Sequence, residues 1–413
     1  MRAYTEIENC RICKGDRLKE ILSLGEQYLT GVFPRDEERM PSKGPLDLVW
    51  CQDCGLVQLR QSYSLPEMYG TNYGYRSGLN ASMVRHLTEK IRRLEAMVSL
   101  ANHDLVVDIG SNDATSLKAY TGNHKKVGID PTGAKFRHFY SADIELIPDF
   151  FSAKKYESIL GTKKAKLITS IAMFYDLEDP AAFVQDIARC LDSEGLWHFE
   201  QSYLPSMLNN TSYDTICHEH IEFYSLAVIR SLLERYRLRI VDVELNDING
   251  GSIAVTACHM DAGHVTDIGA VQGILEEEAD LQLQTSAPYD RFAQKTTEHR
   301  DSLRTLLMEL RQEGKLVLGY GASTKGNVLL QFCGITQAEL PAIADVNPDK
   351  FGCRTPGSGI PIISEVDAKA MKPDYFLVLP WHFRSNIIER EVEFLRDGGS
   401  LIFPLPKIEI KSA

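Results

Sequence analysis

The sequence lacks the features that would assign it to a membrane, to a nucleic-acid partner or to the disulfide-rich secreted proteins. No run approaches the roughly 18 consecutive apolar residues of a membrane span, and residues 1–6 do not resemble a signal peptide. The formal net charge of −12 is the opposite of the basic footprint that nucleic-acid binding requires. Nine cysteines, an odd number without a secretory signal, favour free or metal-bound thiols in a reducing cytoplasm.

A chain of 413 residues is too long for one ordinary hydrophobic core. Its apolar fraction of 44% and charged fraction of 25% are typical of a soluble globular protein. A cysteine-containing segment followed by two sets of strand and helix patterns predicts three domains. We place them at residues 1–75, 76–285 and 286–413.

Two CxxC motifs stand out in the first of these segments. Each places two sulfur atoms on one tight turn, and two such turns close a tetrahedral site for zinc. Four thiolates leave no open coordination position, so the metal is expected to stabilise the fold and to do no chemistry. A redox CxxC or a chance pattern is the alternative. The predicted ligands are Cys10, Cys13, Cys51 and Cys54.

In the second segment, two predicted strands each end in acidic residues. The first strand, 104–109, runs into a DxGxxD turn, and the second, 126–129, is followed by Asp130. Ligands bind at the carboxyl ends of such strands, and an acid about 20 residues after the turn can accept ribose hydroxyls. Because an acidic turn repels a pyrophosphate but suits an amine and a sulfonium, S-adenosylmethionine is favoured over a nicotinamide cofactor or a plain loop. The predicted contacts are Asp108, Gly110, Asn112, Asp113, Asp130 and Pro131.

The order of the elements that follow is that of a class I methyltransferase, a doubly wound α/β sheet of seven strands that ends in a hairpin. The further predicted strands are 144–147, 166–170, 195–201, 239–245 and 251–258, and the helices between them are 179–191 and 225–236.

Residues 216–225 (ICHEHIEFYS) combine two imidazoles, a carboxylate and a thiol. An extended backbone would place His218 and His220 on one face and Glu219 on the other. A solvated loop, half of a metal site and acid–base catalysis all suit this composition, because histidine titrates near neutrality. The stretch follows the fifth strand, at the carboxyl-end rim of the sheet, which favours catalysis.

The last segment begins with a predicted helix over 290–312 and a strand over 315–320 that enters a Gly-rich turn. Backbone N–H groups of such a turn, together with the helix dipole, form an anion site suited to a diphosphate. A purely structural turn is the alternative. Strands at 342–345 and 375–379 complete a second, Rossmann-like sheet. The predicted substrate contacts are Gly321, Ser323, Thr324, Lys325, Asp345 and Trp381, the last being equally suited to a buried core position.

Taken together, the four cysteines, DIGSND (108–113), CHEHIEFYS (217–225) and GYGASTKGN (319–327) occur in an order that resembles the nucleotide-sugar C-methyltransferases, such as the 3-C-methyltransferases of branched deoxysugar biosynthesis. The resemblance covers nearly the whole chain. It implies a structural zinc and a nucleotide-linked 4-keto-6-deoxyhexose that lies between the central and C-terminal domains. It also implies methylation of the carbon beside the ketone, with His220 as general base and Glu219 beside it.

The sequence departs from the pattern of this family at two places. Cys217 stands where many members carry an active-site tyrosine, and residues 173–176 (MFYD) stand where some carry a histidine, so Tyr175 or Asp176 is a candidate substitute.

In the expected mechanism the base removes the C3 proton while a donor stabilises the enolate. Tyr75 and Tyr224 are the predicted enolate donors, and His218 is a predicted substrate contact. Two other functions stay open, an O- or N-methyltransferase and a non-catalytic sugar-nucleotide-binding module. A cytoplasmic monomer or homodimer is expected.

Overall fold

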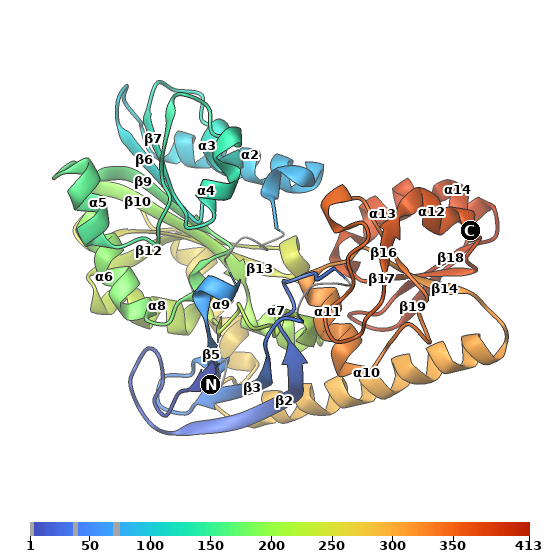
Figure 1. Cartoon of the computed structure of the whole chain (residues 1–413). Helices are drawn as coiled ribbons and strands as arrows, with labels where there is room; N and C mark the ends of the chain where they lie inside the picture. The colour runs from blue at the N-terminus through green and yellow to red at the C-terminus, as the bar shows by residue number, and fades with distance from the viewer. Residues whose placement is uncertain (1–3, 36–39, 69–74) are drawn as a thin grey trace.

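The computed structural model describes residues 4–35, 40–68 and 75–413. Three main sheets and one small strand pair form the framework (Figure 1). In these described ranges, no helix combines the length and the apolar character that crossing a membrane would require.

The N-terminal sheet is antiparallel, and one of its strands comes from far along the chain. Its order is β11-β4-β3-β2, and a short pair, β1 with β5, lies beside it. The strand that completes it, β11 (Glu222–Phe223), belongs to the histidine-rich stretch and pairs with β4. The other bounds are β1 (Tyr4–Glu6), β2 (Leu18–Tyr28), β3 (Lys43–Cys51), β4 (Val57–Leu59) and β5 (Gln61–Tyr63), with the short helix α1 at Leu65–Met68.

The central sheet has seven strands in the order β12-β13-β10-β9-β6-β7-β8. The strands from β6 to β10 are parallel to their neighbours, whereas β13 runs antiparallel between β10 and β12. This arrangement confirms the predicted methyltransferase plan with its closing hairpin. The bounds are β6 (Leu105–Ile109), β7 (Lys125–Ile129), β8 (Ile144–Ile147), β9 (Ala165–Ile171), β10 (Leu191–Ser202), β12 (Leu238–Asn246) and β13 (Ser252–His259).

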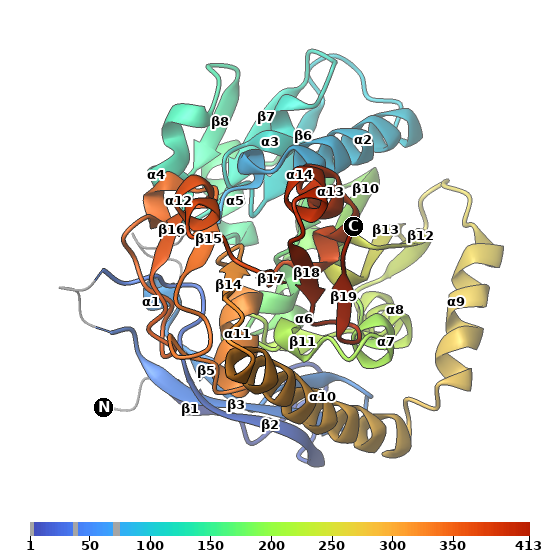
Figure 2. The same ribbon diagram turned by 90° about the vertical axis from the view of Figure 1, so that its right-hand side faces the viewer.

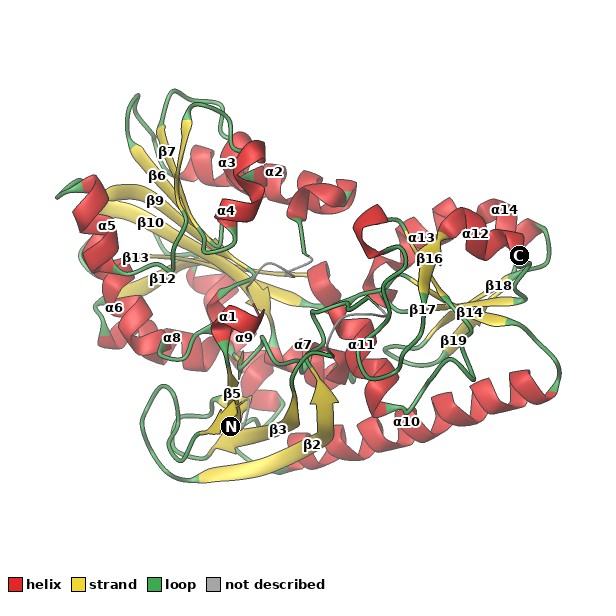
Figure 3. Ribbon diagram, viewed as in Figure 1, coloured by secondary structure: helices red, strands yellow, loops and turns green. Residues whose placement is uncertain are grey.

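Helices cover both faces of this sheet, as Figure 3 shows. Every residue of β6 is buried, and alternate residues enter opposite layers. Val107 packs in the core that includes α5, α6 and α8, whereas Val106 packs in the core that includes α2 and α3. The helices are α2 (Ala81–Met97), α3 (Thr115–Lys118), α4 (Gly133–Phe136), α5 (Ala153–Leu160), α6 (Pro180–Cys190), α7 (Leu204–Asn209), α8 (Leu226–Arg235) and α9 (Ile268–Asp280).

The C-terminal sheet has six strands in the order β16-β15-β14-β17-β18-β19, all parallel to their neighbours except β19. The long helix α10 (Ala287–Gln312) leads into it and runs along the lower edge of Figure 1. The strands are β14 (Val317–Tyr320), β15 (Ile343–Asp345), β16 (Ile362–Ser364), β17 (Tyr375–Val378), β18 (Ser400–Phe403) and β19 (Glu409–Lys411). The helices are α11 (Thr324–Phe332), α12 (Glu365–Ala370), α13 (Arg384–Arg390) and α14 (Val392–Arg396).

One hydrophobic core extends from the N-terminal sheet through residues 204–223 into the C-terminal sheet. The rings of Trp50 in β3 and Tyr289 in α10 have centroids 5.1 Å apart, and those of Tyr213 and Phe332 in α11 are 5.2 Å apart. Figure 2, turned by 90°, shows α10 and α11 beside these N-terminal strands. The C-terminal domain is therefore packed firmly onto the rest of the molecule.

Arg11 joins the first CxxC turn to the neighbouring strands. Its buried guanidinium donates to the carbonyl oxygens of Leu59 and Gln61 at 2.6 and 3.1 Å and to Oγ of Ser62 at 2.8 Å. Glu178 of the central domain lies 3.7 Å from its Nε. The charge of the buried guanidinium is thus offset by several acceptors.

We expect Arg11→Met to lower the free energy of unfolding by about 3 kcal/mol, because it leaves buried acceptors without a donor. Urea unfolding measures this change. Arg230→Met is the control, since Arg230 is an exposed residue paired loosely with Glu234 at 3.9 Å, and its effect should stay within about 0.5 kcal/mol. Equal stabilities for the two variants would contradict the role given to Arg11.

Candidate active site

A cavity of about 910 Å³ lies between the carboxyl ends of the central strands and the C-terminal domain. Its lining includes the turn after β6, residues 171–173 and 175–178, the end of β10, part of the histidine-rich stretch and the Gly-rich turn before α11. Segments that are far apart in the sequence therefore meet around one space. The volume is in the range of small-molecule sites in enzymes.

The acidic turn forms one end of this cavity. Asp108 is buried at the end of β6, where it accepts a hydrogen bond from Oγ1 of Thr169 at 2.6 Å, and burial raises its pKa to about 7. Asp130 directly follows β7 and accepts the backbone N–H of Asn112 at 2.7 Å. Gly110 has φ +76°, and a Cβ there would press on Met173, so a glycine keeps this end open.

Of the predicted cofactor contacts, all but one line the cavity. They are Asp108, Gly110, Asn112, Asp130 and Pro131. Asp113 is instead buried and holds the neighbouring backbone in place. It accepts hydrogen bonds from Oγ1 of Thr115 at 2.5 Å and from the N–H of Gly78 at 3.0 Å. An end rich in carboxylates fits S-adenosylmethionine, whose ammonium and sulfonium groups are cationic.

The backbone of the histidine-rich stretch turns between Cys217 and His220, so the extended conformation that would place both histidines on one face is not present. The N–H of His220 donates to the carbonyl oxygen of Cys217 at 3.1 Å, which closes a turn. Glu219 and His220 line the cavity. His218 points to the N-terminal domain, where its Nε2 lies 3.2 Å from the carbonyl oxygen of Gln27 and its ring meets Tyr63 edge-on.

His220 is held in one tautomer. Its Nδ1 lies 2.9 Å from the carbonyl oxygen of Thr215, which can only accept, so Nδ1 carries the proton and Nε2 keeps its lone pair. Burial, helped by the positive charge of Lys325, lowers the pKa of His220 to about 3. The ring of Tyr175 lies 4.3 Å away between centroids. The imidazole is therefore neutral over the physiological pH range, and the lone pair of Nε2 is not protonated.

Glu219 is buried beside this histidine. Its Oε2 has no hydrogen-bond partner among the described residues, and burial raises its pKa. A Cβ on Gly31 would collide with its Oε1, so the glycine makes room for the carboxyl group. A buried carboxyl oxygen that lacks a partner and lies next to a cavity is suited to meet a ligand.

The remaining residues predicted to act in catalysis divide between the cavity and the core. Tyr75 lines the cavity, with about half of its surface (49%) exposed. Tyr224 does not reach the cavity, because it is fully buried, stacks on Phe174 and donates to Oε2 of Glu222 at 2.9 Å. Cys217 is also fully buried away from the lining, and burial raises its pKa. Tyr175 and Asp176, the suggested substitutes for a histidine, both line the cavity.

The Gly-rich turn of the C-terminal domain forms the opposite wall. Gly321 has φ +81° and lies against Pro380, where a Cβ would clash. Asp345, at the end of β15, accepts the N–H of Ala322 at 2.8 Å and so fixes the turn. Ser323 caps α11 by accepting the N–H of Gly326 at 3.0 Å.

Most of the predicted substrate contacts belong to this wall, namely Gly321, Ser323, Thr324, Lys325 and Asp345. Trp381 does not line the cavity, although its neighbours Pro380 and His382 do. Its indole Nε1 instead donates to Oδ2 of Asp214 at 2.7 Å, and its ring lies against Gly250. Trp381 therefore acts as a contact between the two domains.

The sequence reasoning missed Gln201 and Glu200 at the end of β10. Both amide atoms of Gln201 lack a partner among the described residues, although its side chain lines the cavity and is only 1% exposed. Glu200 lies 2.6 Å from Nε2 of His86 and 3.2 Å from Nζ of Lys90. The rule that ligands bind at carboxyl ends of strands could have found both, since residue 201 ended the fifth predicted strand.

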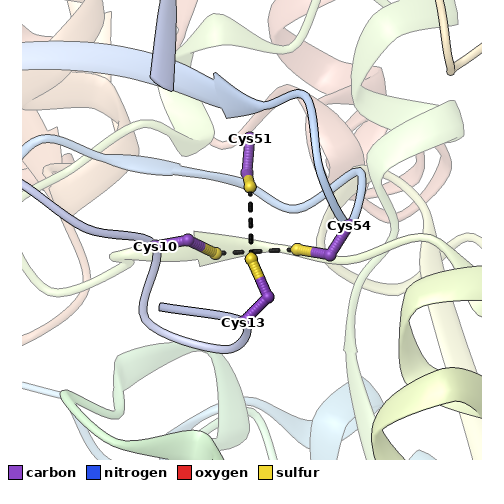
Figure 4. A group of neighbouring side chains, drawn as sticks. All are labelled: Cys10, Cys13, Cys51 and Cys54. Atoms are coloured by element: carbon purple, nitrogen blue, oxygen red, sulfur yellow. Dashed lines mark hydrogen bonds between the residues drawn. The ribbon is translucent and has the colours of Figure 1, made fainter. Parts of the chain in front are cut away.

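The four predicted metal ligands converge in the N-terminal domain, as Figure 4 shows. The sulfur atoms of Cys10 and Cys54 are 3.6 Å apart, and those of Cys13 and Cys51 are 3.5 Å apart. A tetrahedron with Zn–S bonds of about 2.3 Å requires sulfur atoms roughly 3.8 Å apart. The residues therefore fit a structural zinc ion, which would close the two turns and leave no position for a reactant.

Comparison with known proteins covers almost the whole chain. Family models described as "Putative zinc binding domain", "Methyltransferase domain" and "C-methyltransferase C-terminal domain" match residues 10–69, 81–243 and 247–406. The C-methyltransferase NovU of Streptomyces niveus is 34% identical over 411 residues, which span 98% of this chain and 97% of that protein.

Solved structures match at much lower similarity. The 1,6-didemethyltoxoflavin-N1-methyltransferase of Burkholderia thailandensis, with bound S-adenosylhomocysteine, is 11% identical and covers 45% of this chain and 83% of its own, with a TM-score of 0.32. The plantazolicin methyltransferase BpumL in complex with SAH is 12% identical and covers 44% and 87%, with a TM-score of 0.35. These TM-scores are too low to support a functional comparison.

The central sheet with its acidic turn, together with the matched methyltransferase domain, defines an S-adenosylmethionine-dependent methyltransferase with a four-cysteine zinc domain. The full-length match narrows this class. The chain belongs to the C-methyltransferase family.

Removal of zinc should destabilise the protein rather than abolish one chemical step. We expect one zinc per chain by elemental analysis and a fall in melting temperature after treatment with a chelator, because binding to the folded state alone adds to stability. Cys13→Ser should lower both the metal content and the melting temperature, whereas Cys190→Ser, a buried cysteine outside the cluster, should keep the metal. Full metal content in the Cys13 variant would contradict the site.

Proposed function

We propose that the protein transfers a methyl group to C3 of a nucleotide-linked 4-keto-6-deoxyhexose through an enolate. One observation carries the proposal. A neutral imidazole with a free Nε2, that of His220, lines the same cavity as the acidic turn and the Gly-rich turn. A methyl donor at one wall and a sugar nucleotide at the other would meet beside this base.

The chemistry assigned to the residues follows from the weak acidity of a carbon next to a ketone. His220 would accept the C3 proton on Nε2, while the Thr215 carbonyl oxygen stabilises the imidazolium through Nδ1. Glu219 would hydrogen-bond a sugar oxygen or the imidazolium, and Tyr75 is a donor within the same cavity. S-adenosylmethionine supplies the methyl group, so the protein's further task is to align it with the carbanion.

Gln201 would contribute specificity. A buried amide with no partner costs free energy until a ligand pairs with it, so a substrate that bears a hydroxyl or carbonyl group at that place gains over one that lacks it. This need for a polar ligand supports a sugar rather than an apolar substrate.

Two other functions make different predictions. Transfer to oxygen or nitrogen would place the new methyl group on a heteroatom, whereas C-methylation of the sugar gives a methyl-bearing quaternary carbon that product NMR identifies. A non-catalytic module would bind a sugar nucleotide without turnover. Mass spectrometry of incubations with dTDP-, GDP- and CDP-linked 4-keto-6-deoxysugars and S-adenosylmethionine distinguishes turnover from binding.

The base assignment predicts the behaviour of His220→Ala. This variant should bind S-adenosylmethionine, as measured by calorimetry, but should exchange the substrate C3 proton with deuterated water about 10²–10⁴-fold more slowly than the unaltered protein. His138→Ala removes an exposed histidine outside the cavity and serves as the control. Exchange at an undiminished rate in the His220 variant would rule out this residue as the base.

The low pKa of His220 predicts an unusual pH dependence. An ordinary histidine base with a pKa of about 6.5 loses activity tenfold per pH unit below that value. Because burial lowers the pKa of His220 to about 3, its neutral form persists as the pH falls, and the exchange rate should stay level from pH 8 to about 5. Circular dichroism at each pH checks that the protein is folded. A limb with its midpoint near 6.5 would contradict the lowered pKa of His220.

A further inference from the structure

Lys325 lies where the sequence predicts a donor to a diphosphate, but its ammonium points elsewhere. The residue is in the first turn of α11 and is only 9% exposed. Its Nζ donates to the carbonyl oxygen of Asn249 at 2.5 Å, which belongs to the 3-10 helix η5 (Ile248–Gly250) between β12 and β13 of the central domain. The side chain therefore bridges two domains instead of folding back over its own Gly-rich turn.

The same turn of α11 adjoins the proposed base. α11 packs against η4 (Tyr213–Thr215), whose last residue provides the carbonyl oxygen that fixes His220. A Cβ on Gly31 would touch Glu219 and would lie 3.7 Å from Oγ1 of Thr324, so the start of α11 is next to Glu219. Lys325, Glu219 and His220 all line the cavity.

Electrostatics support the same placement. The charge of Lys325 contributes to the lowered pKa of His220, after burial, and it likewise lowers the pKa of His382. Burial lowers the pKa of Lys325 itself, whereas the Asp214 carboxyl group raises it. Trp381 holds that carboxyl group in place through its indole N–H. The ammonium is thus close enough to the proposed base and to a buried acid to affect the pKa of His220 and to be affected by Asp214.

The other cationic residues described in the lining have different surroundings. Arg76 lies over the ring of Phe139, Arg85 is exposed, Lys350 donates to the Ala322 carbonyl oxygen near Asp345, and Arg390 pairs with Glu365. Lys350 is therefore placed to meet an anion at the Gly-rich turn. Lys325 is placed at the junction with the central domain, where the sugar would react.

We propose that Lys325 hydrogen-bonds the substrate ketone oxygen and stabilises the enolate, a role that rests on the proposed function and that replaces its predicted contact with the diphosphate. An ammonium has three donors, of which Asn249 uses one. A fixed positive charge in a site with little water stabilises a developing oxyanion far more than the same charge does in bulk solvent.

The steps balance as follows. The C3–H bond breaks, its proton goes to Nε2 of His220, and its electron pair forms the enolate whose oxygen faces Lys325. C3 then forms a bond to the donor methyl group, the C–S bond breaks with its electrons staying on sulfur, and the ketone is restored. His220 finally returns its proton to water, so no oxidant or reductant is needed.

The test separates the rate of enolate formation from affinity for the nucleotide. With dTDP-4-keto-6-deoxyglucose in deuterated water, Lys325→Met should slow C3 exchange at saturating substrate about 10²–10³-fold, as loss of one oxyanion donor does. Its Kd for the substrate should stay within about threefold of the unaltered protein's value, because in this proposal Lys325 makes no contact with the diphosphate. Lys350→Met is the comparator and should show the opposite split, with the larger change in Kd. Lys325→Arg, which keeps the charge, should recover part of the exchange.

Each outcome has a distinct meaning. Undiminished maximal exchange in Lys325→Met, or a weakened Kd with normal exchange, would overturn the inference and return Lys325 to the diphosphate. Lack of exchange in the unaltered protein with the whole panel of 4-keto-6-deoxysugar nucleotides would overturn the proposed function itself. If Lys325→Met does not bind S-adenosylmethionine, Lys325→Gln, which keeps a hydrogen-bond donor without the charge, is measured instead and should also be slow.

Discussion

A single stretch of the chain, residues 213–223, forms hydrogen bonds to all three parts of the molecule through its backbone and the Asp214 side chain. The geometry of the cavity depends on this stretch. The N–H of Leu59 in the N-terminal sheet donates to the carbonyl oxygen of Ile221, and the N–H of Ile221 donates to the carbonyl oxygen of Tyr175 in the central domain. Asp214 accepts the indole N–H of Trp381 from the C-terminal domain. His220 lies inside this stretch and so inherits a fixed position from three directions.

The four-cysteine zinc site is connected to this stretch through the N-terminal sheet. Cys51 ends β3 and Cys54 precedes β4, and β4 is the strand on which β11 is built. A metal ion that closes the two cysteine turns thereby holds the sheet against which the histidine-rich stretch is registered. An ion outside the cavity can stabilise the turn that carries His220 in this way, because β11 is hydrogen-bonded to a strand of that sheet.

How far the sequence predicts this molecule depends on the kind of signal. The cysteine spacing predicts the four-cysteine cluster, and the rule about parallel sheets predicts that the acids after β6 and β7 lie together at the cavity, because these residues are close in sequence or placed by one rule. The two-residue strand β11 carries no periodicity, so nothing in the sequence reveals that residues 222–223 join the N-terminal sheet. Without that pairing, the turn that sends His218 and His220 in opposite directions is equally hidden. Tyr224 and Trp381 show the same limit, since burial beside Glu222 or Asp214 is a tertiary property.

The continuous core between the N-terminal sheet and the C-terminal domain also bears on how ligands enter and leave. A movement of the C-terminal domain away from the rest would expose that core. It would also break the buried hydrogen bond between the Trp381 indole and the Asp214 carboxyl group. A wide hinge motion of the C-terminal domain is therefore costly. We expect ligands to enter and leave at the rim of the cavity instead, where the lining residues Tyr75, Leu79 and Phe150 have large exposed side chains.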